Sequence, residues 1–204
     1  ETSDIDYSAK AVIVATGVHP RELNVPGEKE FRNKGVSYCT VCDGPLFSGK
    51  ITAVVGGGNS ALEAGLMLAD ISLKVYMINK NAQFKGDSIL LDKLMTKKNV
   101  EIVYNAKTTQ IVGEQFVNGL KYAKDSEYEI KVDGIFIHIG MIPNSYIVPV
   151  EVQKNEVGEI VVNKNCETNI PGLYAAGDVT DVPFNQIVIA DGQGCIAKLS
   201  AVQY

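Results

Sequence analysis

A run of glycines at 56–58 is the feature that most constrains how this chain can fold. It follows an uninterrupted apolar stretch, 51–55, and it precedes a segment whose apolar residues recur at helical spacing, 61–69. A continuous apolar run is typical of a strand that is covered on both faces in a parallel sheet. The sequence therefore predicts an α/β fold in which a strand, a tight glycine turn and a helix follow one another.

The glycine turn matches the pattern G-x-G-x-x-A. The first glycine permits the tight turn, the second lets a pyrophosphate approach the backbone, and the small third residue lets helix and strand pack closely. The free N–H groups and the positive end of the helix also favour a phosphate. We predict a dinucleotide-binding loop here; the alternative is a glycine-rich turn that binds nothing. The loop residues are Gly56, Gly57, Gly58, Asn59, Ser60 and Ala61.

The strand after this helix should end in the residue that selects the nicotinamide nucleotide. An acid there would bind the ribose 2′-hydroxyl of NAD, and a basic neighbour would accept the 2′-phosphate of NADP. Asn79 stands at this end, and Lys80 and Lys85 are the basic candidates. Lysines meet a phosphate as mobile point charges, so we expect a modest preference for NADPH, with NADH or another donor left open. In the alternative interpretation both lysines are simply solvated surface.

The remaining pattern predicts short strands and further helices. Runs separated by turn residues between 100 and 132 predict a small antiparallel meander, and the polar, proline-containing segment 19–34 is typical of a linker. The strands 11–15 and 173–176 are expected to be buried. The other expected strands are 51–55, 73–78, 100–104, 109–112, 117–122, 128–132, 135–139 and 159–162, and the expected helices are 61–69, 87–97 and 187–202.

A pair of cysteines, Cys39 and Cys42, precedes the glycine loop and is followed directly by Asp43. In the first turn of a helix such a pair closes a small disulfide ring, and the helix N-terminus raises the thiolate fraction that thiol–disulfide exchange requires. Asp43 is a candidate for proton transfer to or from a leaving thiolate. The alternatives are two inert, buried cysteines or half a zinc site. Zinc would need two more ligands, and neither Cys166 nor Cys195 belongs to a paired motif; we expect both as small core residues. We therefore predict a redox pair and no metal.

Composition and charge argue against several classes of protein. With 46% hydrophobic and 21% charged residues, the chain of 204 residues has enough apolar material for a globular core. A net charge of −5 without a basic block argues against nucleic-acid binding, and no apolar run is long enough to cross a bilayer. With no signal peptide and few cysteines, we expect a cytoplasmic protein. The chain begins at Glu1 rather than Met, and we interpret it as a fragment, a processed product or a chain whose start is missing.

The combined order of these motifs resembles the low-molecular-weight thioredoxin reductases, and the flavoprotein subunit of alkyl hydroperoxide reductase is similar. Cys-x-x-Cys-Asp-Gly stands about a dozen residues before the glycine loop, and the flanking motifs agree at 15–17, 140–144 and 175–178. The resemblance covers essentially the whole chain. It departs from the family at two places: no G-x-G-x-x-G unit for FAD precedes residue 11, and Asn79, Lys80 and Asn81 stand where NADPH-using members have a His-Arg-Arg run.

The resemblance implies a two-domain α/β flavoprotein and a route for electrons. A Rossmann-like NAD(P)-binding domain, 22–142, would be inserted into a partial FAD-binding domain formed by 1–21 and 143–204. Electrons would pass from NADPH to FAD, then to the Cys39–Cys42 disulfide, and then to the disulfide of thioredoxin or a glutaredoxin-like protein.

The same resemblance assigns roles to individual residues. Cys42 would face the flavin ring, Asp43 would match the family's acid, and the protein would be a cytoplasmic homodimer. Residues near FAD would be Thr16, Gly17, Gly177, Asp178, Gln186 and Ile187. The alternatives are an alkyl hydroperoxide reductase flavoprotein, a ferredoxin-linked reductase, and a non-catalytic dinucleotide-binding fragment.

Overall fold

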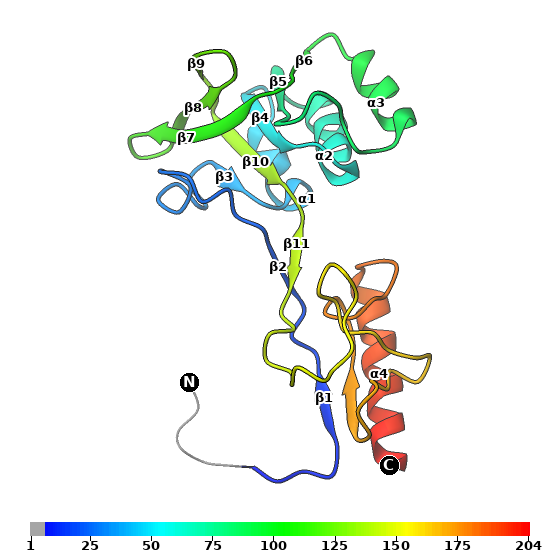
Figure 1. The fold of residues 1–204 in the computed structure, drawn as a ribbon. Helices are drawn as coiled ribbons and strands as arrows, with labels where there is room; N and C mark the ends of the chain where they lie inside the picture. The colour runs from blue at the N-terminus through cyan, green and yellow to red at the C-terminus, as the bar shows by residue number, and fades with distance from the viewer. Residues whose placement is uncertain (1–6) are drawn as a thin grey trace. The chain divides into compact units, whose positions relative to one another are not determined.

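The computed structural model describes residues 7–204, which form two compact units (Figure 1). The central unit is Pro20–Gly140, and the terminal unit combines residues 7–19 with Met141–Tyr204. The expected first segment, 1–21, begins with six residues that lie outside the described part of the chain. No helix among residues 7–204 has both the length and the apolar character needed to cross a membrane.

The central unit is built on a five-stranded parallel sheet with the order β3-β10-β4-β5-β6. A parallel sheet with helices between its strands confirms the predicted α/β fold class. The glycine loop follows the middle strand, β4. The sequence did not predict β3, whose two residues are too few to show a hydrophobic period. The strands are β3 (Val36–Ser37), β4 (Ile51–Gly56), β5 (Lys74–Ile78), β6 (Val100–Val103) and β10 (Gly134–His138).

Different layers cover the two faces of this sheet. Helices α2 (Asn59–Ala69) and α3 (Ser88–Met95) pack on one face, around a core that includes Leu62, Met77 and Leu94. The predicted antiparallel meander covers the other face and contributes Ile111 and Leu120 to a second core, but it has three strands: the strand expected at 100–104, β6, pairs in parallel with β5 instead. Because both faces are covered, β4 reads as an uninterrupted apolar run. The meander strands are β7 (Lys107–Gly113), β8 (Val117–Ala123) and β9 (Glu127–Ile130).

Close packing between α2 and the sheet depends on a small residue in the helix. A Cβ atom on Gly65 would lie 2.5 Å from the sulfur of Met77, so only glycine lets the helix lie this near β5. This contact fixes the first turn of α2 above the carboxyl end of the parallel strands, where the ligands of such sheets bind.

The segment before the cysteine pair is more ordered than the predicted linker. It contains β2 (Val18–Pro20) and a fully buried carboxylate, Glu28. Glu28 accepts hydrogen bonds from the backbone N–H groups of Leu23 and Asn24, at 2.8 and 2.6 Å, and from the hydroxyl of Tyr38 at 2.9 Å. Burial and the neighbouring Glu28 raise the pKa of Tyr38, so its hydroxyl remains a donor. This network holds the residue that precedes Cys39.

The terminal unit contains a smaller sheet and the longest described helix. Strand β1 (Val12–Val14) pairs in parallel with β12 (Leu173–Ala175), and α4 (Ile187–Gln203) packs on this pair through Ala197. A second two-stranded sheet joins β2 to β11 (Met141–Pro143). The register of β1 and β12 places the predicted motifs at 15–17 and 175–178 at the same end of the sheet.

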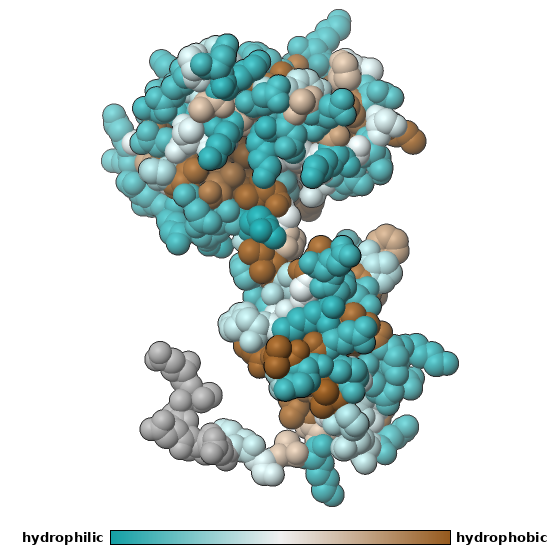
Figure 2. Space-filling view, in the orientation of Figure 1, coloured by the Kyte–Doolittle hydropathy of each residue, from teal (hydrophilic) through white to brown (hydrophobic). Residues whose placement is uncertain are grey.

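Three expectations about this unit are wrong. Val12 and Ile13 in β1 are exposed, because a sheet of only two strands leaves a face uncovered; apolar surface of the unit appears brown in Figure 2. The strand expected at 159–162 is reduced to isolated bridges at Ile160. Cys195 is exposed rather than buried, since it lies two residues from the buried Ala197 and so on the opposite side of α4.

Candidate active site: the disulfide and the glycine loop

Cys39 and Cys42 form a disulfide at the start of a short helix, α1 (Thr40–Asp43), with the two Cα atoms 5.3 Å apart. Cys39 is the N-cap residue, and its sulfur accepts a hydrogen bond from the backbone N–H of Cys42 at 3.2 Å. A sulfur at this position lies where helix N–H groups favour negative charge. The arrangement therefore matches the predicted redox pair in both pairing and location. Since the two sulfurs are bonded to each other, they are not half of a zinc site in this state.

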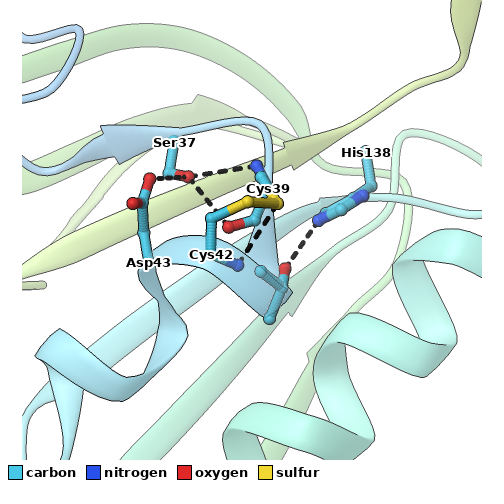
Figure 3. The surroundings of a disulfide bond; sticks show 6 residues. Ser37, Cys39, Cys42, Asp43 and His138 are labelled. Atoms are coloured by element: carbon cyan, nitrogen blue, oxygen red, sulfur yellow. Dashed lines mark hydrogen bonds between the residues drawn. A yellow bond between two sulfur atoms is a disulfide. The ribbon is translucent and has the colours of Figure 1, made fainter. Parts of the chain in front are cut away.

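Asp43 is held beside the disulfide by a buried serine (Figure 3). The hydroxyl of Ser37 donates to Oδ2 of Asp43 at 2.6 Å, and the hydroxyl oxygen of Ser37 accepts from the backbone N–H of Cys39 at 3.1 Å. Ser37 thus links the carboxylate to the backbone of one of the two cysteines. The geometry suits an acid that gives a proton to, or takes one from, a sulfur of the pair.

We expect Ser37→Ala to slow thiol–disulfide exchange by about tenfold and Asp43→Asn to slow it by roughly 10²-fold. Ser37→Ala leaves the acid present but unpositioned, whereas Asp43→Asn removes it. The rate of reduction of a small aromatic disulfide by the pre-reduced protein measures both effects. Ser126→Ala, in an exposed turn, is the matched control and should leave the rate unchanged. Equal rates for Ser37→Ala, Asp43→Asn and the unmodified protein would contradict this role.

The glycine loop connects β4 to α2 and leaves open space beside its third glycine. A Cβ atom on Gly56 would lie 2.1 Å from the carbonyl oxygen of His138, and one on Gly57 would lie 2.7 Å from Oδ1 of Asn79. At Gly58, the N-cap of α2, an added Cβ meets nothing within 4 Å, and no side chain caps the helix. The first two glycines are therefore required by the fold itself. The third borders a free space at a helix N-terminus, as a pyrophosphate requires.

A pocket of about 570 Å³ lies along this loop, wholly within the central unit. Four basic residues line it, Arg21, Lys80, Lys85 and Lys107, although the whole chain carries a net charge of −5. The acidic residue of the lining, Glu22, is paired with Lys29 and Arg32 at 3.6 and 3.4 Å. This concentration of positive charge suits a ligand with several phosphates.

Sequence reasoning found Lys80 and Lys85 but missed Arg21 and Lys107. Both lie far along the chain from the glycine loop, and only the tertiary fold brings them to it. Lys107 opens β7, directly after the carboxyl end of β6. The signal that points to it is its place after a parallel strand, at the edge of the sheet where ligands bind.

Asn79 directly follows β5, where a ribose-binding residue was expected; it lines the pocket, but its amide is hydrogen-bonded to the backbone of the next segment. Its side chain is buried; Oδ1 accepts from the backbone N–H of Asn81 at 3.1 Å, and Nδ2 donates to the carbonyl of Gln83 at 2.9 Å. Asn79 thus shapes the segment that carries both lysines. The backbone N–H of Lys85 closes this segment onto the carbonyl of Gly57 at 2.7 Å.

A second pocket, of about 360 Å³, lies within the terminal unit. Five of the six residues that the resemblance assigned to FAD line it: Gly17, Gly177, Asp178, Gln186 and Ile187. Thr16 does not line it; its hydroxyl donates instead to the carbonyl of Asn144 at 2.8 Å. Sequence reasoning also missed Gln193, whose Oε1 accepts from the backbone N–H of Gly177 at 2.8 Å.

The chemistry of this second pocket fits only one part of a flavin dinucleotide. Its lining includes the carboxylates of Asp178 and Asp191 and no lysine or arginine. Carboxylates accept hydrogen bonds from hydroxyl groups, so the ribityl chain of FAD fits here, whereas its phosphates would meet negative charge without compensation.

The remaining cysteines differ in reactivity. Cys166 is buried and its sulfur donates weakly to the carbonyl of Gln193 at 3.5 Å; burial raises the pKa of its thiol and so suppresses the reactive thiolate. Cys195 is exposed on α4. Neither joins the Cys39–Cys42 pair.

Comparison with known proteins shows the family to which the chain belongs. The pyridine nucleotide-disulphide oxidoreductase family matches residues 1–194, and the chain belongs to this family, as its motifs predicted. It is 47% identical, over 200 residues, to an alkyl hydroperoxide reductase subunit of Escherichia coli (strain K12), covering 96% of this chain and 38% of that protein. It is 46% identical to an NADH dehydrogenase of Bacillus subtilis (strain 168), covering 96% of this chain and 39% of that protein.

Solved structures agree with the fold. The thioredoxin reductase from Streptococcus pyogenes MGAS5005 matches with a TM-score of 0.82 and 34% identity, covering 100% of this chain and 68% of that one. The predicted likeness to low-molecular-weight thioredoxin reductases is thereby confirmed. The chain spans about two-fifths of the length of the curated relatives it matches.

Proposed function

We propose that this chain is the disulfide-bearing part of a flavin-dependent reductase, which passes electrons from a nicotinamide nucleotide through FAD to Cys39–Cys42 and then to a protein disulfide. The observation that carries the proposal is one unit that holds both a disulfide beside a positioned acid and a basic pocket along a glycine loop. In this proposal the central unit binds the nucleotide, and the terminal unit contributes to the flavin site. FAD, when bound, supplies the transfer of electrons between nucleotide and disulfide.

The residues of the chain suit the exchange that follows. In the reduced pair, Cys39 is the attacking thiolate, because the N–H of Cys42 donates to its sulfur. Cys39 attacks one sulfur of the partner's disulfide, a mixed disulfide forms, and one partner thiolate leaves. Cys42 then attacks the sulfur of Cys39, the ring closes, and the second partner thiolate leaves. Asp43, held by Ser37, moves the protons that these thiolates gain or lose.

The partner that the proposal favours is thioredoxin or a glutaredoxin-like protein, because solved relatives of the same fold are thioredoxin reductases. A second candidate is the disulfide of a peroxide-reducing protein, favoured by the 47% identity to a subunit of alkyl hydroperoxide reductase. The two candidates can be distinguished by measuring how fast the same reduced protein reduces each of them. At equal concentration, the true partner is reduced faster. Slow reduction of both would contradict the proposed partner class.

The electron donor follows from the basic pocket. Lys80, Lys85 and Lys107 present positive charge, and Asn79 stands where an acid would bind the ribose of NAD, so we propose a modest preference for NADPH over NADH. The relative named an NADH dehydrogenase makes NADH the competing donor. Because the lysines are exposed, their contacts should weaken as salt screens them over a Debye length of about 10 Å at 0.1 M.

We expect Lys80→Ala and Lys85→Ala each to lower the ratio of kcat/KM for NADPH to that for NADH by roughly two- to fivefold at low salt. The ratio for the unmodified protein should itself fall as ionic strength rises. Lys98→Ala is the control, because Lys98 precedes β6 at the amino end of the sheet. A strong preference for NADH that salt does not change would contradict this proposal, as it requires a ribose-binding acid. Reduction by ferredoxin, with no response to either nicotinamide nucleotide, would show that the glycine loop has a structural role only.

A further inference from the structure

His138 lies between the glycine loop and the disulfide and contacts both. It ends β10, where it lies in parallel register with Gly56, the first residue of the loop. The two backbones are so close that a Cβ on Gly56 would lie 2.1 Å from the carbonyl oxygen of His138. His138 also lines the basic pocket. Any ligand that orders the glycine loop therefore acts directly on the backbone of His138.

The side chain of His138 reaches α1 on the other side (Figure 3). Its Nε2 forms a hydrogen bond of 2.7 Å with the hydroxyl of Thr40, the residue next to Cys39. Thr40 is buried, so the hydroxyl has few alternative partners. Burial also lowers the pKa of His138, which keeps the imidazole neutral at pH 7. A neutral ring can exchange hydrogen bonds with a hydroxyl without burying a charge.

We propose that His138 is a positioning residue that couples nucleotide binding at the glycine loop to the redox state of Cys39–Cys42. The proposal rests on the proposed function, because it needs a nucleotide at that loop. The contacts run from Gly56 to the backbone of His138, from its ring to Thr40, and from Thr40 to the adjacent Cys39. In the sequence, His138 stands inside the apolar run 135–139, a position that predicts only a satisfied core or interface histidine.

The disulfide supplies the two states that such coupling requires. Reduction adds two electrons and two protons, breaks the S–S bond, and leaves two thiols that must move apart to van der Waals contact. Thr40 lies between the two cysteines in the chain, so this movement changes the bond from its hydroxyl to His138. The structure with the disulfide closed has the bond formed. The oxidised protein should therefore bind the nucleotide more tightly than the reduced protein.

Because nucleotide binding and reduction are thermodynamically linked, their coupling can be measured as a shift in the reduction potential of the Cys39–Cys42 disulfide. If the oxidised state binds a nucleotide more tightly, saturating nucleotide must make the disulfide harder to reduce by the same factor. A fivefold difference in affinity, at the lower end of usual couplings, corresponds to a shift of about 20 mV for a two-electron couple.

The test titrates the disulfide of the full protein with mixtures of reduced and oxidised dithiothreitol. Each protein disulfide that is reduced converts one dithiothreitol to its cyclic disulfide. The probe is aminopyridine adenine dinucleotide, with and without a 2′-phosphate, which accepts no hydride and so leaves the flavin unchanged. The fraction of Cys39 and Cys42 present as thiols is counted by alkylation and mass spectrometry, with and without saturating probe. Probe binding is measured separately by calorimetry.

We expect the probe to shift the potential of the unmodified protein by at least about 20 mV to more negative values. Thr40→Val and His138→Phe should abolish this shift, and Thr40→Ser, which keeps the hydroxyl, should retain it. A purely structural role would change the potential or the stability without probe, but not the shift that the probe causes. Comparison of Thr40→Val with Thr40→Ser shows whether the hydroxyl carries the coupling, even if His138→Phe fails to fold.

Three results would overturn the inference. The probe could bind the unmodified protein without shifting the potential, or Thr40→Val could keep the full shift; in either case the proposed function would stand. If neither form of the probe binds the unmodified protein, the coupling and the proposed nucleotide site both fail.

Discussion

Replacing Cys42 with serine should reduce the rate of protein-disulfide reduction by at least about a thousandfold, because it removes a covalent step altogether. Cys39→Ser should have an effect of the same size, since one sulfur alone can neither accept two electrons as a disulfide nor close the ring. Neither variant can form the disulfide, so each should bind the nicotinamide nucleotide as the reduced, unmodified protein does, because the basic pocket is not lined by either cysteine. Turnover of the partner's disulfide and nucleotide binding are measured on the same preparations.

The control for this prediction is Cys195→Ser. Cys195 is exposed and not part of a disulfide, so its thiol is accessible to reagents, yet it should have no part in turnover. Full activity in Cys42→Ser, or a loss in Cys195→Ser equal to that in Cys42→Ser, would refute the assignment of the redox pair. Stoichiometric zinc in the reduced, active protein would favour the metal alternative instead.

Gly58→Val should weaken nucleotide binding by about 10²-fold while leaving the fold intact. Apart from the adjacent backbone, nothing lies within 4 Å of a Cβ at this position, so the branched side chain would enter the space that a pyrophosphate needs. Calorimetric binding of NADPH and NADH measures the effect, and the midpoint temperature of unfolding checks the fold. Gly58→Ala should give a smaller loss in the same direction.

Gly57→Ala is the comparison variant for Gly58→Val, because Gly57 packs against the protein itself. A Cβ there would lie 2.7 Å from Oδ1 of Asn79, so we expect this variant to disturb the protein even without nucleotide. An unchanged affinity in Gly58→Val, with unfolding also unchanged, would show that the glycine loop does not hold the pyrophosphate.

Local pattern predicted the strand, loop and helix at 51–69 because each part carries its own signal. An apolar run, a set of small turn residues and a helical period are all visible in adjacent positions. The disulfide was predictable for the same reason, since Cys39 and Cys42 are close in sequence. The features that sequence reasoning missed are those that depend on distant contacts. Lys107 reaches the pocket only because β6 is the neighbour of β5.

Residues whose side-chain direction matters were the hardest to predict. Asn79 occupies the position of a ribose-binding residue, but its amide turns inward because the backbone of Asn81 and Gln83 offers it two hydrogen bonds. His138 sits in an apolar strand, where nothing in the sequence reveals that Thr40 will lie opposite its ring. Cys195 stands among small residues that resemble a core, but α4 buries only the side that carries Ala197.

The most direct test of the proposed function is to count the thiols that a nicotinamide nucleotide creates in the full, flavin-loaded protein without oxygen. The protein is mixed with NADPH or with NADH, quenched with an alkylating reagent and analysed by mass spectrometry. We predict that Cys39 and Cys42 become alkylated together, while the alkylation of Cys166 and Cys195 is the same with and without nucleotide. A disulfide that stays closed in the presence of both nucleotides, although dithiothreitol opens it, would contradict the account.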